Sequence, residues 1–142
     1  MSLSPKTIEI VKATAAPVAA NAQAITTRMY EILFSQYPET KVLFENSDPD
    51  QHKKLAGAIS AYAANIDNLA VLSKAVEKMA TIHVLKKIQP EHYPMVGNSI
   101  LKAIKDVLGD AANSDVLDAW QDAYFFLANI LIKREKELYA IA

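Results

Sequence analysis

The sequence predicts an all-α protein, and three observations point to that class. Apolar residues recur every three or four positions through most of the chain, which is the spacing of a buried helical face. No segment alternates between apolar and polar residues over a convincing length, so we expect no strand. Only 3 of the 142 residues are glycine, while alanine and leucine are common, and this composition favours helices.

Length and composition narrow the class further. A chain of 142 residues fits one domain, 1–142, and can bury one sizeable core. A formal net charge of -1 gives no indication of a nucleic-acid partner, and no apolar run is long enough for membrane insertion. Cysteine is absent, which excludes disulfides, iron–sulfur clusters and thioether-linked haem. These absences together predict a cytoplasmic protein.

Proline, glycine and polar breaks divide the chain into helices. Ser4 followed by Pro5 is typical of an N-cap with proline in the first helical position. Gly109 is expected to end the helix before it. The segments expected to be helical are 5–19, 21–36, a short turn at 40–44, 49–66, 69–85, 91–108 and 114–139.

His83 is a polar residue on an apolar helical face. It continues the stripe formed by Leu69, Leu72, Val76 and Met79, so we expect it to point into the core. One interpretation is a buried neutral histidine hydrogen-bonded to backbone, which is the more frequent situation. The other is an axial ligand of a metal or a haem, because neutral imidazole is the commonest such ligand. The helix alone leaves both open.

Glu135 interrupts the apolar stripe of the last helix. A buried carboxylate is costly unless it is hydrogen-bonded or paired. Either the end of this helix is exposed and Glu135 is solvated, or Glu135 meets a donor in the core. Tyr93, at the start of the stripe on 91–108, is a candidate for that donor.

Tyr30 and Gln51 are two more polar residues on apolar stripes. Taken alone, Tyr30 is typical of a core tyrosine, and Gln51 is typical of a helix start that faces water. Taken with His83, Tyr93 and Glu135, they suggest a core with polar groups on two sides. Such a core suits a cofactor with two chemically different faces.

Several short stretches are specific in combination, although each one alone is weak. They are Met29-Tyr30-Glu31, Ile82-His83, His92-Tyr93-Pro94-Met95-Val96-Gly97 and Asp118-Ala119-Trp120. With these stretches, nearly the whole chain resembles the globin domain of flavohaemoglobins and the related single-domain bacterial haemoglobins. The resemblance implies a globin fold, a three-over-three helical sandwich around haem. The implied cofactor is haem b, iron protoporphyrin IX held without covalent bonds.

The resemblance also implies roles for these residues. His83 would be the iron ligand, with Tyr93 and Glu135 hydrogen-bonded behind it. Tyr30 and Gln51 would face the oxygen-binding side, and with Tyr93 and Glu135 they form the expected catalytic set. The other residues expected to contact haem are Phe44, Leu55, Met79, Tyr93 and Val96.

The function implied is binding of O₂, NO and other small haem ligands. We expect O₂-dependent oxidation of nitric oxide to nitrate, with an external reductase as partner. The alternatives are a non-enzymatic protein for oxygen storage or delivery, a sensor of gaseous ligands, and a helical domain without haem. The sequence departs from the family pattern at His52, where proline is frequent, and this histidine could add a second distal base or a sixth iron ligand.

Overall fold

The computed structural model describes residues 3–44 and 51–141, and the side chains at 51 and 52 lie outside that description. All regular secondary structure in the described residues is helical, which confirms the predicted all-α class. The elements are α1 (Pro5–Ala20), α2 (Ala22–Gln36), η1 (Pro38–Phe44), α3 (Gln51–Ala64), η2 (Leu69–Leu72), α4 (Ser73–Leu85), α5 (His92–Leu108), η3 (Gly109–Ala111) and α6 (Ser114–Ile141).

The helix ends show which local signals determine the boundaries. The Ser4 hydroxyl accepts a hydrogen bond from the Thr7 backbone N–H at 3.1 Å, so the predicted N-cap of α1 is confirmed. Gly109 ends α5 with a φ of 59°, a conformation that glycine adopts without a Cβ clash. The single helix expected over 69–85 is instead a 3₁₀ turn, η2, followed by α4. Such turns are common at helix N-termini.

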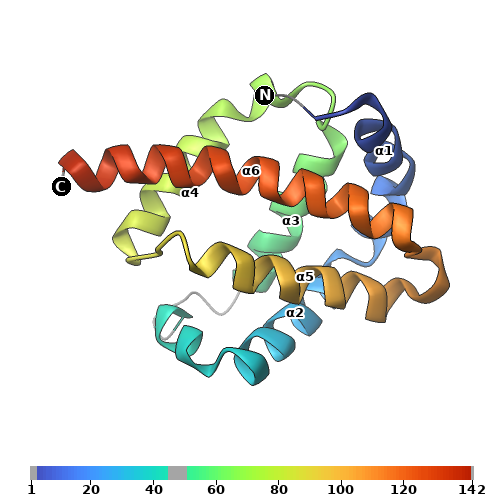
Figure 1. The fold of residues 1–142 in the computed structure, drawn as a ribbon, viewed down its shortest axis with the longest axis horizontal. Coiled ribbons are helices and arrows are strands. Elements are labelled where there is room, and N and C mark those ends of the chain that lie inside the picture. Colours follow the sequence, from blue (N-terminus) through green and yellow to red (C-terminus); the bar gives the residue numbers. More distant parts are fainter. Residues whose placement is uncertain (1–2, 45–50, 142) are drawn as a thin grey trace.

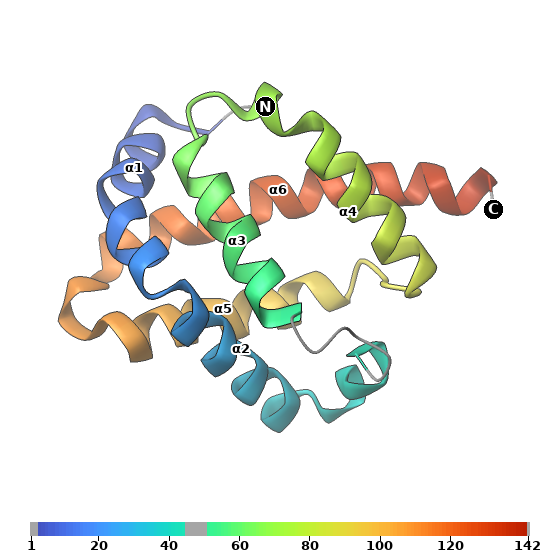
Figure 2. The same cartoon turned by 180° about the vertical axis from the view of Figure 1, so that it is seen from behind.

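The helices pack in two layers, as the three-over-three sandwich predicts. Figure 1 shows α5 and α6 lying across the near side of the molecule. After the half turn of Figure 2, α3 and α4 come to the front and cross over them. The helix α1 packs on α3 and α6, and α2 packs on α3 and α5. None of the helices in the described part of the chain has both the length and the apolar character to cross a bilayer.

The core has two unequal parts. The larger cluster joins buried residues of α1, α2, α3, α5 and α6. The smaller cluster lies beside α4 and contains Ala80, Tyr93, Ala128 and Leu131. The helix α2 buries six residues, whereas Ala80 is the one fully buried residue of α4. The inward face of α4 therefore lies against something other than packed protein, and that is the cavity described next.

Candidate cofactor site

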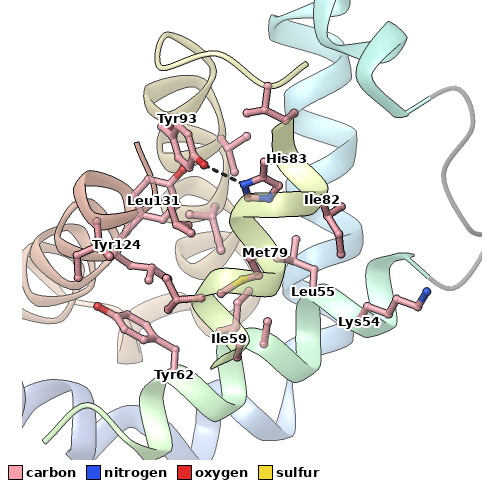
Figure 3. A pocket seen from close by; sticks show the side chains of 18 of the residues that line it. Lys54, Leu55, Ile59, Tyr62, Met79, Ile82, His83, Tyr93, Tyr124 and Leu131 are labelled. Atoms are coloured by element: carbon pink, nitrogen blue, oxygen red, sulfur yellow. Dashed lines mark hydrogen bonds between the residues drawn. The ribbon is translucent and has the colours of Figure 1, made fainter. Parts of the chain in front are cut away.

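A large cavity lies between α3 and α4 and reaches α2, α5 and α6. Its volume is about 1120 Å³, above the range of about 300–1,000 Å³ that is usual for small-molecule sites. Figure 3 shows Leu55 and Ile59 on α3 facing Met79 and His83 on α4 across this space. Most of the lining is apolar, so the cavity suits a large, mainly apolar group.

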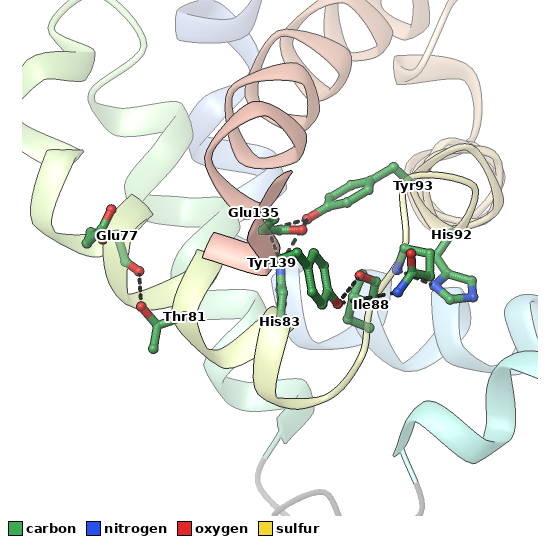
Figure 4. A network of polar contacts seen from close by, with 9 residues as sticks. Glu77, Thr81, His83, Ile88, His92, Tyr93, Glu135 and Tyr139 are labelled. Carbon is green, nitrogen blue, oxygen red and sulfur yellow. Dashed lines mark hydrogen bonds and ion pairs between the residues drawn. The ribbon is translucent and has the colours of Figure 1, made fainter. Parts of the chain in front are cut away.

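His83 brings a polar side chain to the wall of this cavity. Its Nδ1 atom lies 2.9 Å from the Tyr93 hydroxyl and 2.9 Å from a carboxylate oxygen of Glu135. The Tyr93 hydroxyl donates to Glu135, with distances of 2.7 and 2.8 Å to the two carboxylate oxygens. Figure 4 shows the three residues converging from α4, α5 and α6.

These contacts decide between the interpretations that the sequence left open. The side chain of Glu135 is only 4% exposed, so the solvated reading was wrong and the contact with Tyr93 is confirmed. The Nδ1 atom of His83 pairs with side chains rather than with backbone. The role of His83 as a metal ligand stays a prediction that this geometry supports.

The network favours one tautomer of His83. Burial raises the pKa of Tyr93 well above its usual value, and the hydrogen bond to Glu135 raises it further, so this hydroxyl keeps its single proton. That proton is donated to Glu135. An ionised carboxylate only accepts hydrogen bonds, so the short contact between Glu135 and His83 favours the tautomer with its proton on Nδ1. In that tautomer the lone pair lies on Nε2, the nitrogen that can bind a metal.

The end of α4 holds His83 in place. The Ile88 N–H donates to the His83 carbonyl at 2.9 Å, and the Lys87 N–H donates to the Val84 carbonyl at 3.0 Å. With Lys87 in a left-handed conformation (φ 63°), this is the Schellman arrangement that closes a helix. The Tyr139 hydroxyl on α6 donates to the Ile88 carbonyl at 2.6 Å and ties this connection to the last helix.

Tyr124 and Gly97 position Tyr93 on α5. The Tyr124 hydroxyl donates to the Tyr93 carbonyl at 2.7 Å. Its ring lies against Gly97 so closely that a Cβ there would come within 2.7 Å of a ring carbon of Tyr124, and within 3.3 Å of Phe125. Sequence reasoning did not assign Tyr124 or Tyr139 a role. The available signal was a tyrosine in the last helix, because a buried tyrosine hydroxyl usually finds a partner.

The other predicted site residues lie on the same cavity. Phe44, Leu55, Met79 and Val96 all line it, and so does Tyr30. The Tyr30 ring packs on Phe44 at 5.3 Å in an edge contact. Gln51 begins α3, but its side chain and that of His52 lie outside the described residues, so their predicted roles stay predictions.

The donor set and the walls fit a haem. One imidazole, oriented by a buried acidic side chain, can supply a ligand nitrogen from α4. The apolar side chains of α3 and α4 on either side match the faces of a porphyrin.

Comparison with known proteins identifies the family of the chain. The globin family model matches residues 27–131. The chain is 51% identical over 140 residues to a flavohemoprotein of Rhodopirellula baltica, covering 96% of this chain and 34% of that protein, so it spans about a third of that relative.

Two solved structures are similar over the whole chain. One is an engineered carbene transferase made from a provisionally assigned nitric oxide dioxygenase of Rhodothermus marinus. It matches with a TM-score of 0.94 and 40% identity, and the match covers 99% of this chain and 98% of that one. The other is a flavohemoglobin of Malassezia yamatoensis with bound FAD and heme, with a TM-score of 0.87, 26% identity and coverage of 99% and 38%. With its fold, its cavity and these matches, the chain belongs to the globin family.

Proposed function

We propose that this globin holds haem b and oxidises nitric oxide with dioxygen to nitrate. The observation that carries the proposal is the hydrogen-bonded set of His83, Tyr93 and Glu135 at the cavity wall. A histidine held this way differs from one bonded to a backbone carbonyl, because the carboxylate draws the Nδ1 proton and makes Nε2 more basic. Similarity to a protein provisionally assigned as a nitric oxide dioxygenase supports the same reaction.

The proximal residues would hold and tune the metal. His83 would bind the iron through Nε2, and Glu135 would fix the ring plane and the tautomer. Tyr93 would keep Glu135 in position by donating to its carboxylate. When bound, haem supplies the iron at which dioxygen and nitric oxide combine. A more basic Nε2 pushes electron density toward the metal, which favours oxygen activation over simple storage.

Residues of α2 and α3 would act on the gaseous ligand. We infer that the Tyr30 hydroxyl donates a hydrogen bond to an oxygen ligand in the cavity, with its ring held by the edge contact with Phe44. Leu55 would limit the space beside it. Gln51, at the first position of α3, would add a second donor.

The reaction needs one electron from outside. Nitric oxide, dioxygen and one electron give one nitrate ion, so each cycle must be completed by a reductant. The Malassezia flavohemoglobin holds FAD together with heme. We infer that a separate flavin-dependent reductase supplies this electron to the present chain.

Stopped-flow mixing of the oxygenated, haem-containing protein with nitric oxide tests the proposal. With a flavin reductase and NADH present, we expect one nitrate per nitric oxide over many cycles. A single slow oxidation that no reductase can make repeat would contradict the enzyme and favour oxygen storage.

Replacement of one hydroxyl tests the role of Tyr30. Tyr30→Phe should release dioxygen about fivefold faster, because one hydrogen bond of about 1 kcal/mol is lost. Tyr37→Phe is the matched control, because Tyr37 is a tyrosine that does not line the cavity. Equal release rates in both variants would remove Tyr30 from the ligand site.

A further inference from the structure

The helix α4 is held in the molecule mainly by α6. It packs closely on α6 and on η2, whereas α3 lies across the cavity from it. Ala80 is the one fully buried residue of Ser73–Leu85. Figure 2 shows α4 on the outside of the molecule, where it crosses α6. An element that buries so little apolar surface belongs to those that open at the lowest free energy.

Two consecutive residues of α6 tie α4 at two separate points. Arg134 donates two hydrogen bonds to Glu77, at 2.8 and 2.9 Å, and a carboxylate oxygen of Glu135 lies 2.9 Å from Nδ1 of His83. Glu77 and His83 are six residues apart, so these contacts lie about 9 Å apart along the helix axis. Figure 4 shows Glu77 and His83 at different points along α4.

The two halves of α4 are not held equally. The end at His83 is also tied by Tyr139, whose hydroxyl donates to the Ile88 carbonyl at 2.6 Å. For residues 73–82, the pair of Arg134 and Glu77 is the one side-chain hydrogen bond or ion pair to another helix within the described part of the chain. The turn that precedes them, η2, has no buried residue. Loss of this pair would therefore free the first half of α4 and leave the second half in place.

The cavity reaches the contact between α4 and α6. Glu77 on α4 and both Ile130 and Arg134 on α6 line it. The side chains of Glu77 and Arg134 are 50% and 36% exposed, and Ile130 is 40% exposed. This part of the cavity wall is therefore also molecular surface, and the pair of Arg134 and Glu77 lies across it.

We propose that the first half of α4 opens away from α6 to admit and release haem b, and that the Arg134–Glu77 ion pair keeps it closed. The proposal rests on the proposed function only in requiring that the cavity holds haem. The two parallel hydrogen bonds of an arginine to one carboxylate have a defined geometry, which suits one closed position. Both side chains are partly exposed, so water can replace their contact at a modest cost in free energy.

The rates of haem uptake and of haem loss, measured separately, test the proposal. Loss is followed by the Soret band when the haem-containing protein is mixed with excess apomyoglobin, and uptake when haem is mixed with the cofactor-free full-length chain. The ion pair stabilises the closed position in both forms, so Arg134→Gln should speed uptake and loss alike, about threefold, and leave haem affinity unchanged. Glu77→Gln should have the same effect. The double variant should be no faster than either single variant, because the same pair is lost in all three.

Amide hydrogen exchange of the haem-containing protein locates the movement. In Arg134→Gln, the amides of residues 73–82 should exchange about threefold faster, whereas those of α2 and α5 should keep their rates. Faster exchange in all helices would instead show a general loss of stability and contradict a local opening.

Two variants serve as matched controls. Glu137→Gln removes the third partner of Arg134, at 3.1 Å, but Glu137 lies on α6 itself and does not tie α4. Lys12→Gln breaks another exposed ion pair, the one with Asp67, on the other side of the chain's core. Neither control should change the rate of uptake or of loss.

Two kinetic results would overturn the assignment. One is that Arg134→Gln leaves both rates unchanged. The other is that it speeds loss without speeding uptake, because the pair would then stabilise bound haem and not the closed position of α4. Both leave the nitric oxide reaction of the haem-containing protein untouched, so they are distinguishable from its failure. Absence of a Soret band in the unaltered protein would instead reject the haem site itself, and this proposal with it.

Discussion

The larger core cluster and the α4 side of the molecule are stabilised in different ways. In the larger cluster, Val11, Val18 and Ala123 are completely buried, and none of the three lines the cavity. Beside α4, the cluster has four buried members among the described residues, and the helix faces a cavity. Apolar burial is non-directional, whereas the hydrogen bonds of His83, Tyr93 and Glu135 depend on distance and angle. The first region should therefore fold by itself, and the second should depend on what occupies the cavity.

The largest change in the free energy of unfolding should come from a substitution in the larger core cluster. Ile66 is 2% exposed in the larger cluster and does not line the cavity. Ile66→Ala should lower the free energy of unfolding by about 2–5 kcal/mol, through lost burial and the space left behind. Urea unfolding followed by circular dichroism should give the same loss with and without haem. Val71→Ala, at a position 58% exposed, is the control. A loss confined to the haem-containing protein would contradict the independence of this cluster.

Substitutions on the α4 side should change haem binding more than they change the stability of the fold. His83→Gly should weaken haem binding by about a hundredfold or more, because losing the proposed ligand itself should cost no less than losing a residue that supports one. Imidazole added to the buffer should restore the optical bands by filling the space left by the side chain. His92→Ala is the control, since His92 lines the cavity but its Nδ1 accepts a bond from the Gln89 backbone. Unchanged bands in His83→Gly without imidazole would remove the proposed iron ligand.

A smaller change within that network should follow from Tyr93→Phe. The ring and the backbone contact with Tyr124 remain, but Glu135 loses one donor. We expect haem affinity to fall about tenfold and the iron–histidine stretching frequency in the Raman spectrum to decrease. Tyr139→Phe, which frees the Ile88 carbonyl instead, should leave that frequency nearer its original value. Identical spectra for Tyr93→Phe and the unaltered protein would show that Tyr93 does not tune His83.

The smallest effect should come from a surface pair that joins α4 to α6. The hydrogen bond from Arg134 lowers the pKa of Glu77. A lowered carboxyl pKa stabilises the fold above the unfolded-state pKa, and this stabilisation is lost as pH falls through the folded-state pKa. Arg134→Gln should therefore lower stability at neutral pH, and the difference from the unaltered protein should vanish in acid.

The matched pair in the first region is Lys12 with Asp67, whose nearest atoms are 2.8 Å apart. The hydrogen bond from Lys12 lowers the pKa of Asp67, as the bond from Arg134 lowers that of Glu77. Lys12→Gln should give the same dependence of stability on pH, with no effect on the rate of haem loss. Faster haem loss in Lys12→Gln would show that the two regions are coupled.

Polar residues that interrupt the apolar face of one helix could be predicted from the sequence. Glu135 stood out because a charge on an apolar stripe needs a partner, and the structure supplies Tyr93 and His83. The break between η2 and α4 was not predictable from periodicity, because both segments keep the apolar stripe of one helix.

The supporting contacts were beyond sequence reasoning for a related reason. Tyr124 and Tyr139 donate to the carbonyls of Tyr93 and Ile88. Every residue has a carbonyl, so the sequence does not mark which one a tyrosine will meet. Tertiary packing alone brings these groups together.

Gly97 offers a remote point of adjustment for His83, the proposed iron ligand. One added methyl group there would press on the Tyr124 ring, and either that ring or the separation of α5 and α6 would have to yield. Those helices carry Tyr93 and Glu135, which are joined by a hydrogen bond, so a shift of a few tenths of an ångström at position 97 would weaken the bond that supports His83. A substitution at Gly97 is therefore a way to alter the hydrogen bonds that support His83 without changing Tyr93 or Glu135.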